Sequence, residues 1–307
     1  MKALFFEMIF RSLIMLAKAL WRRMPHTPYG IFLYSYYYVV YTLIIFISLL
    51  TSPQKVGITM VLWTWFREID DILDGDDYQT PATVEKLLFR KKIVVQNLSK
   101  EIILKELHGN DRLLFLGVHL SKKLKIENDF TFYFQKVWEL MLAEYDWRME
   151  KRIPSKVEIK TFARLQDEAI LFFGKMFLWV DINTFKLLEI AQDGLFTRID
   201  WIEDLKRDLK AGIVHLPMEK CLQNNLSYEE LVSIRTKDVF NHPSLQKMVK
   251  EELTLLVLLW QQFSGKRQDL LNATRSKVFA FIYNKFVINR FENELKKLCG
   301  AYGIVFG

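Results

Sequence analysis

No charged side chain occurs between Ile31 and Leu50, and this run of twenty residues limits the folds open to the chain. As a helix it is long enough to span a bilayer, and basic residues flank it on both sides. However, five tyrosines lie within residues 34–41, no second uncharged stretch of comparable length follows, and the mean hydropathy of the whole chain is close to zero. We therefore expect a core helix that lines an apolar cavity, with a single membrane anchor as the alternative.

The remaining sequence shows helical periodicity with clear start and stop signals, and no alternating strand pattern or hairpin turn. Capping boxes begin helices at Ser155 and Ser227, and Gly212 stands where a helix commonly ends. The spacing predicts helices over residues 1–23, 56–73, 83–107, 111–124, 129–150, 155–180, 183–210, a short one from 227, 243–263 and 267–298. With no linker or repeat, we predict one all-α domain covering residues 1–307.

Residues 1–23 form an amphipathic pattern with basic residues on one side and apolar residues on the other. Because no small-residue cleavage site follows, we do not expect a signal peptide. Two interpretations stay open: a helix packed on the domain, which we favour, and a helix on a membrane surface. We expect the protein in the cytoplasm, with peripheral membrane association as the alternative.

Composition excludes several classes of function. The twelve glycines form no dinucleotide-binding or P-loop motif. The two cysteines, Cys221 and Cys299, fit reduced structural thiols, and the five histidines are far apart and form no metal-binding pattern. The net charge of +7 suits an anionic membrane or a polyanionic small substrate better than nucleic acid, because the basic residues are not massed in one arm.

An acidic cluster ends the helix predicted over 56–73. Asp71, Asp74 and Arg67 lie within about 100° of Asp70 on a helical wheel, so they share one side of the helix. Unpaired carboxylates at this spacing repel one another and raise each other's pKa. A hard divalent ion such as Mg²⁺, completed by substrate phosphates, would stabilise such a cluster. A solvated acidic helix end is the alternative.

A second acidic helix follows more than a hundred residues later. Asp200, Asp204 and Asp208 recur every four residues, and Glu203 and Arg207 lie within about 60° of Asp200 on the wheel. Like charges at this spacing destabilise a helix unless they are neutralised. Lys206, Arg207 and Lys210 could do this on a charged, solvated face, which is the alternative. Two such helices could together bind two or three Mg²⁺ ions and a diphosphate leaving group.

The departure of a diphosphate leaves a carbocation, which apolar and aromatic walls must shield from water. The uncharged helix upstream and single aromatic residues beside the acidic motifs could supply such walls. We predict that the substrate pocket is lined by Tyr38, Tyr41, Trp63, Phe162, Gln166 and Phe196.

At these residues the chain resembles the squalene/phytoene synthase family, the head-to-head trans-isoprenyl diphosphate synthases. Residues 65–75 are similar to its first aspartate motif. Residues 200–204, followed by Gly212 and Leu216-Pro217, are similar to its second, and Asp146 before Arg152 resembles the segment between them. The resemblance covers about a quarter of the chain. It implies a class I isoprenoid synthase bundle around a central apolar cavity, with Mg²⁺-bound prenyl diphosphates.

The resemblance also implies roles for single residues. It makes Asp70, Asp71, Asp74, Asp200 and Asp204 the catalytic, metal-handling residues, and Arg67 a diphosphate ligand. To the metal ligands we add Glu203 and Asp208 from the second acidic stripe, and to the diphosphate ligands Arg198 and Arg207.

Four departures from the family pattern matter. Phe196 stands where the family usually has an asparagine, residues 162–170 are not the expected small residues, and no serine-rich flap precedes the first motif. The second motif also runs one turn longer and so resembles that of membrane-embedded aromatic prenyltransferases, which need many spans.

Three functions therefore stay open. The leading one is Mg²⁺-dependent head-to-head coupling of two prenyl diphosphates, farnesyl or geranylgeranyl, with release of diphosphate. The second is a class I terpene cyclase acting on a single prenyl diphosphate. The third is a scaffold protein without activity, against which the retained repelling carboxylates argue. The sequence does not predict the oligomeric state.

Overall fold

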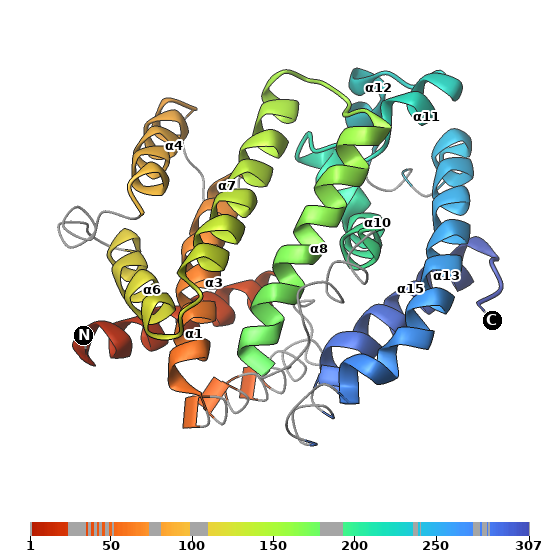
Figure 1. Ribbon diagram of the computed structural model, residues 1–307. Helices are drawn as coiled ribbons and strands as arrows, with labels where there is room; N and C mark the ends of the chain where they lie inside the picture. The colour runs from red at the N-terminus through yellow and green to blue at the C-terminus, as the bar shows by residue number, and fades with distance from the viewer. Residues whose placement is uncertain are drawn as a thin grey trace. The chain divides into compact units, whose positions relative to one another are not determined.

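The structure is a computed structural model, and it describes residues 2–23, 52–73, 81–98, 110–178, 193–235, 241–272 and 283–306, together with single positions 35, 38, 39, 42, 45, 46, 49, 50, 239, 277 and 281. The chain divides into two compact units, residues 1–138 and 139–307, which are taken separately below. The expectation of one domain stays a prediction. Within the described ranges every regular element is a helix, which confirms the all-α class (Figure 1).

Unit 1 is organised around a single central helix. It contains α1 (Lys2–Arg23), α3 (Pro53–Leu73), α4 (Pro81–Gln96), α6 (Asp111–Lys123) and the first half of α7 (Glu127–Met149). α3 packs on both α1 and α6, and in Figure 1 α1 runs across it. The close approach occurs at Gly57, where an added Cβ would lie 2.8 Å from Leu120 and 3.1 Å from Phe5. The core combines aliphatic residues with an aromatic group, in which the Trp65 ring centroid lies 4.8 Å from that of Phe134.

The uncharged stretch between 31 and 50 is described only in part. Its described residues are helical, but Val39, Phe46 and Leu50 are exposed, and none of those with described side chains is fully buried. A helix buried on all sides would not expose these residues. Within the described ranges, no helix is both long and apolar enough to cross a membrane.

Unit 2 is built around α10. It contains the second half of α7, α8 (Lys156–Leu178), α10 (Leu195–Lys210), α11 (Met218–Gln223), α12 (Tyr228–Ser233), α13 (Pro243–Asn272), the π-helix η1 (Tyr283–Ile288) and α15 (Asn289–Tyr302). α10 packs on α8, α13 and α15. Its apolar face, which includes the buried Ile199 and Leu205, belongs to the large core of this unit, together with the buried thiols Cys221 and Cys299.

Several predicted helix boundaries are confirmed. The Glu158 carboxylate accepts hydrogen bonds from the Ser155 backbone and hydroxyl, both at 2.8 Å, and α8 starts at the next residue. Ser227 caps α12 through the same reciprocal pattern. α10 ends at Lys210, two residues before Gly212, whose φ of 78° is the left-handed conformation that favours glycine.

Other boundaries were predicted wrongly. The break expected near residue 264 does not occur, because α13 continues to Asn272 through the open position Gly265. One exposed glycine costs a helix only about 1 kcal/mol, and packing of the long helix outweighs that. The short helix α11 after Pro217 was predicted as a connection, and α4 begins two residues earlier than expected. The helix predicted over 83–107 ends at Gln96, and the one predicted over 183–210 begins only at Leu195, after a turn at residues 193–194. Residues 99–107 and 183–192 lie outside the described residues.

Candidate functional site

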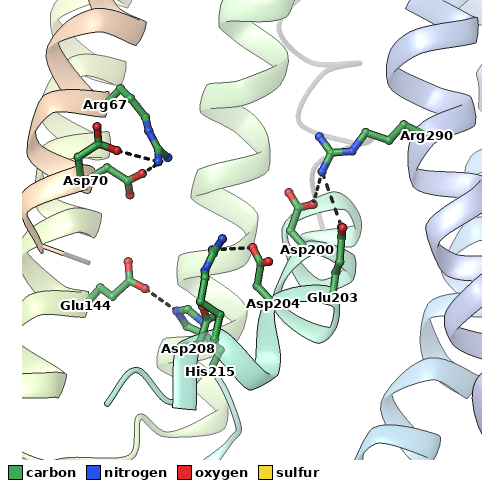
Figure 2. Close-up of polar contacts among 11 residues, drawn as sticks. Arg67, Asp70, Glu144, Asp200, Glu203, Asp204, Asp208, His215 and Arg290 are labelled. Atoms are coloured by element: carbon green, nitrogen blue, oxygen red, sulfur yellow. Dashed lines mark hydrogen bonds and ion pairs between the residues drawn. The ribbon is translucent and has the colours of Figure 1, made fainter. Parts of the chain in front are cut away.

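The first acidic cluster lies on the last turns of α3. The Arg67 guanidinium contacts both Asp70, at 2.5 Å, and Asp71, at 2.7 Å (Figure 2). Asp71 is buried, whereas 39% of the Asp70 side chain is exposed. One carboxylate of the pair therefore faces solvent while the other is held inside the unit. Asp74 lies outside the described residues.

A buried ion network fixes the rotation of α3 behind this cluster. Lys91 of α4 has no exposed surface, and its Nζ donates to Glu68 of α3 at 2.7 Å and to Asp111 of α6 at 2.6 Å. The indole Nε1 of Trp65 donates to the same Asp111 carboxylate at 2.8 Å, and Arg90 donates to its second oxygen. Because Glu68 lies one residue after Arg67, the network sets the direction in which the acidic cluster points.

The second acidic cluster depends on how α10 starts. Asp167 of α8 is fully buried and accepts hydrogen bonds from the backbone N–H groups of Phe196, at 3.0 Å, and Thr197, at 2.8 Å. These are orphan donors of the first turn, so Asp167 acts as an N-terminal cap supplied by another helix. Burial raises the pKa of Asp167 to about 7, although the hydrogen bonds from Thr197 and Phe196 oppose the shift. Gly194, at φ 62°, lets the chain turn against Ala163.

α10 then presents three carboxylates that are each partly exposed. Arg290 of α15 lies 3.5 Å from Asp200 and 3.7 Å from Glu203, so one guanidinium nitrogen faces two carboxylates (Figure 2). Arg207 contacts Asp204 at 2.8 Å. The structure thus brings Asp200, Glu203 and Asp204 to one side of α10, as the spacing predicts, with arginines beside them.

Asp208, one turn further on, is in a different environment. It is buried and lies 3.3 Å from His215 Nδ1, and His215 Nε2 lies 2.7 Å from Glu144 of α7 (Figure 2). The imidazole also stacks on Trp201, with ring centroids 4.4 Å apart. Burial raises the pKa of Asp208, and the nearby Asp204 charge adds to that shift, while His215 opposes it.

The charge on His215 follows from its two carboxylate partners. Burial alone would lower the pKa of the imidazole, but the Glu144 charge and the hydrogen bond to Asp208 outweigh it and raise the pKa to about 9. His215 is therefore an imidazolium at neutral pH, and it ties the end of α10 to α7.

The remaining predicted diphosphate ligand, Arg198, points away from the carboxylate face of α10. Its Nε donates to Glu252 of α13 at 2.6 Å, and its Nη1 donates to the carbonyl of Asp193 at 3.3 Å. Only 15% of its side chain is exposed. Its role as a diphosphate ligand stays a prediction that needs this ion pair to open.

The predicted pocket residues have different environments. Phe196 is buried, with its ring centroid 4.9 Å from Phe291 and 5.2 Å from Phe263, and Phe162 is buried between Trp147 and Trp201. The other four are less buried or lie outside the description. Trp63 is 37% exposed, Gln166 and Tyr38 are half-buried, and Tyr41 lies outside the described residues. The buried side-chain oxygen of Gln166 has no hydrogen-bond partner among described residues, so a ligand or water would satisfy it.

The donor atoms suit Mg²⁺ in type. In the part of the chain that the structure describes, no three acidic, histidine or cysteine side chains converge as a ready metal site. Two pairs of carboxylates do converge, each on one guanidinium: Asp70 and Asp71 on Arg67, and Asp200 and Glu203 on Arg290. Mg²⁺ is commonly held by one or two carboxylates plus substrate phosphates, so each pair could hold such an ion if its guanidinium moved aside.

Sequence reasoning missed two contributors to these clusters. Arg290 lies 90 positions after Asp200, and only its place in a basic C-terminal helix hinted at it. Glu144, the partner of His215, lies two residues before Asp146, in the segment that the sequence associated with the site.

Comparisons of the chain with protein-family models, with curated proteins and with solved structures find no match.

Proposed function

We propose that the chain is a Mg²⁺-dependent enzyme that ionises an allylic prenyl diphosphate. In its leading form it couples two such substrates head-to-head, as the resemblance to squalene/phytoene synthases implies. The observation that carries the proposal is the convergence of the partly exposed Asp200 and Glu203 on a single nitrogen of Arg290. Two carboxylates there already lie beside one guanidinium nitrogen, and on α3 Asp70 and Asp71 contact the two terminal nitrogens of the Arg67 guanidinium.

In this proposal the carboxylates bind the metal and the arginines bind the diphosphate. The carboxylates of Asp70, Asp71, Asp200 and Glu203 would hold Mg²⁺, and Asp74, Asp204 and Asp208 stay predicted ligands. Mg²⁺, when bound, would neutralise the negative charge of the departing diphosphate. Arg67, Arg207 and Arg290 are beside these carboxylates and can donate to diphosphate oxygens, which guanidinium groups match well.

A cyclase that acts on one prenyl diphosphate is the second candidate, and the position of Phe196 favours it. Where the family usually has a polar side chain near the metal, this chain has a phenylalanine buried against Phe291 and Phe263. That position supplies no polar ligand for a second diphosphate.

The test is a product assay on the purified full chain. Incubation with farnesyl or geranylgeranyl diphosphate and Mg²⁺ should release diphosphate and give a terpenoid product. A product with twice the carbon count of the substrate supports coupling, and one with an equal count supports cyclisation. Absence of diphosphate release with both substrates would refute both candidates.

Matched variants test the assigned residues. Asp200→Asn combined with Glu203→Gln, or Asp70→Asn alone, should lower the rate by about a hundredfold or more, because each removes charge that holds the cation. Glu251→Gln on α13 and Glu85→Gln on α4 change exposed carboxylates of the same units and should leave the rate unchanged. Equal loss in the control variants, or full activity without Asp70 and Asp200, would contradict the assignment.

A further inference from the structure

One face of α1 is apolar and exposed although the helix is firmly attached to unit 1. Phe6, Phe10 and Ile14 are 71%, 67% and 41% exposed. They follow one another at intervals of four residues, so each is turned only about 40° from the last. They form one stripe along the helix, which we call the outer stripe.

The opposite face of α1 accounts for its attachment. Leu4, Met8 and Ser12 are buried, and the Ser12 hydroxyl is hydrogen-bonded to Thr64 of α3 at 2.7 Å. Arg11 donates to Asn110 beside α6 at 3.0 Å. The outer stripe is therefore not the docking face of α1 within its own unit. A solvated helix would carry polar residues there.

The charge of α1 indicates which partner covers the outer stripe. The helix contains five basic residues, Lys2, Arg11, Lys18, Arg22 and Arg23, and one acid, Glu7, which leaves a net charge of +4 out of +7 for the whole chain. Glu7 is already paired with Arg11 at 2.9 Å, and Lys18 is exposed one turn beyond Ile14. A second copy meeting this face would bring the same positive charge, so self-association on it is disfavoured.

We propose that the outer stripe of α1 binds the surface of an anionic phospholipid bilayer. Exposed aromatic and aliphatic side chains on a basic helix are the features of helices that lie in the membrane interface, with the apolar face among the acyl chains and the basic residues at anionic headgroups. Unit 1 also exposes Val39, Phe46 and Leu50, at intervals of seven and four residues, which adds apolar surface to the same unit. The proposal is independent of the proposed enzymatic function, because it needs no substrate.

Flotation of the purified full chain with vesicles tests the proposal. The chain should bind vesicles of phosphatidylcholine with phosphatidylserine, bind pure phosphatidylcholine more weakly, and lose part of the difference at about 0.5 M NaCl. Phe6→Ser with Phe10→Ser should lower the partitioning of the chain onto vesicles at least roughly tenfold, because two phenylalanine side chains are no longer transferred from water into the bilayer. Lys18→Glu should weaken binding to the anionic vesicles more than to the neutral ones.

The matched control is Phe89→Ser with Phe132→Ser. These phenylalanines are 67% and 48% exposed in the same unit, but they lie on α4 and α7. This control should bind vesicles as the unchanged chain does, and circular dichroism should show that both double variants fold. The proposal is overturned if the unchanged chain does not bind anionic vesicles. It is also overturned if both double variants lose binding equally, or if the α1 variant only converts a dimer to a monomer.

Discussion

Replacing His215 by glutamine should destabilise unit 2 in a way that depends on pH. The substitution keeps a polar side chain between Glu144 and Asp208 but removes the positive charge. The imidazole side chain is only 7% exposed, so its interactions with both carboxylates are little screened by solvent. Breaking a buried charge pair from one side typically costs about 3–5 kcal/mol.

The stabilisation of the folded state by His215 should decrease as the pH rises. The pKa of His215 rises from 6.5, its ordinary value, to about 9 in the folded chain, despite burial, because of Glu144 and Asp208. A raised pKa stabilises the folded state fully below the unfolded value, and that stabilisation is lost as the pH rises through the folded value. At 1.36 kcal/mol for each pKa unit, the charge on His215 contributes about 3 kcal/mol below pH 6.5. This contribution should disappear between pH 6.5 and about 9.

Urea unfolding followed by circular dichroism measures the effect. The difference in free energy of unfolding between the unchanged chain and His215→Gln should be largest near pH 6 and smaller by about 3 kcal/mol near pH 9.5. Thr254→Ala, at an exposed position of α13 in the same unit, removes no titratable group, so it serves as the control and should give a constant difference. A constant difference for His215→Gln over the same range would refute the assignment of an imidazolium between the two carboxylates.

Four further predictions concern single positions. Lys91→Met should lower the free energy of unfolding by up to about 3–5 kcal/mol in urea titrations, because it removes the buried cation from Glu68 and Asp111 and leaves Asp111 only the exposed Arg90; no loss would show that the network is not formed. Gly194→Ala should cost about 3 kcal/mol or more by the same measurement, because an L residue resists the positive φ and the new Cβ meets Ala163; a neutral result would contradict the described turn. Arg290→Ala should raise the affinity for Mg²⁺ alone up to about fivefold in calorimetric titration, the value of an exposed ion pair, and weaker Mg²⁺ binding would contradict its competing position. Cys221, whose pKa burial raises to about 11, should react with a thiol reagent only after unfolding; fast labelling of the folded chain would contradict this.

The helices could be predicted from sequence where their ends are set by local chemistry. Ser155 and Ser227 carry their capping partners three residues away, and Gly212 supplies a left-handed residue, so the signals are contained in short segments. The wrong boundary near Gly265 has the opposite origin. There the local signal is weak, and packing along the whole of α13 decides the outcome.

In the candidate site, too, some features could be predicted from local sequence and others depend on tertiary packing. The grouping of Asp200, Glu203 and Asp204 on one side of α10 follows from helix periodicity alone. The partners of these carboxylates do not follow, because Arg290 approaches through tertiary packing. The burial of Asp208 with His215 is also set by tertiary packing, although both lie within one short segment. Phe196 shows the same limit, since periodicity places it beside the motif but only packing shows that it faces Phe263 and Phe291.

The arginines beside the two carboxylate pairs have a consequence for how the chain matures. In small zinc domains the unfolded apo chain gains its structure from the ion, so folding and metal uptake are one event. Here Arg67 and Arg290 each offset one of the two negative charges of their carboxylate pair without an ion. Under the proposed function, a newly synthesised chain would therefore fold without the cation and bind it afterwards. Chelators should consequently leave its secondary structure intact.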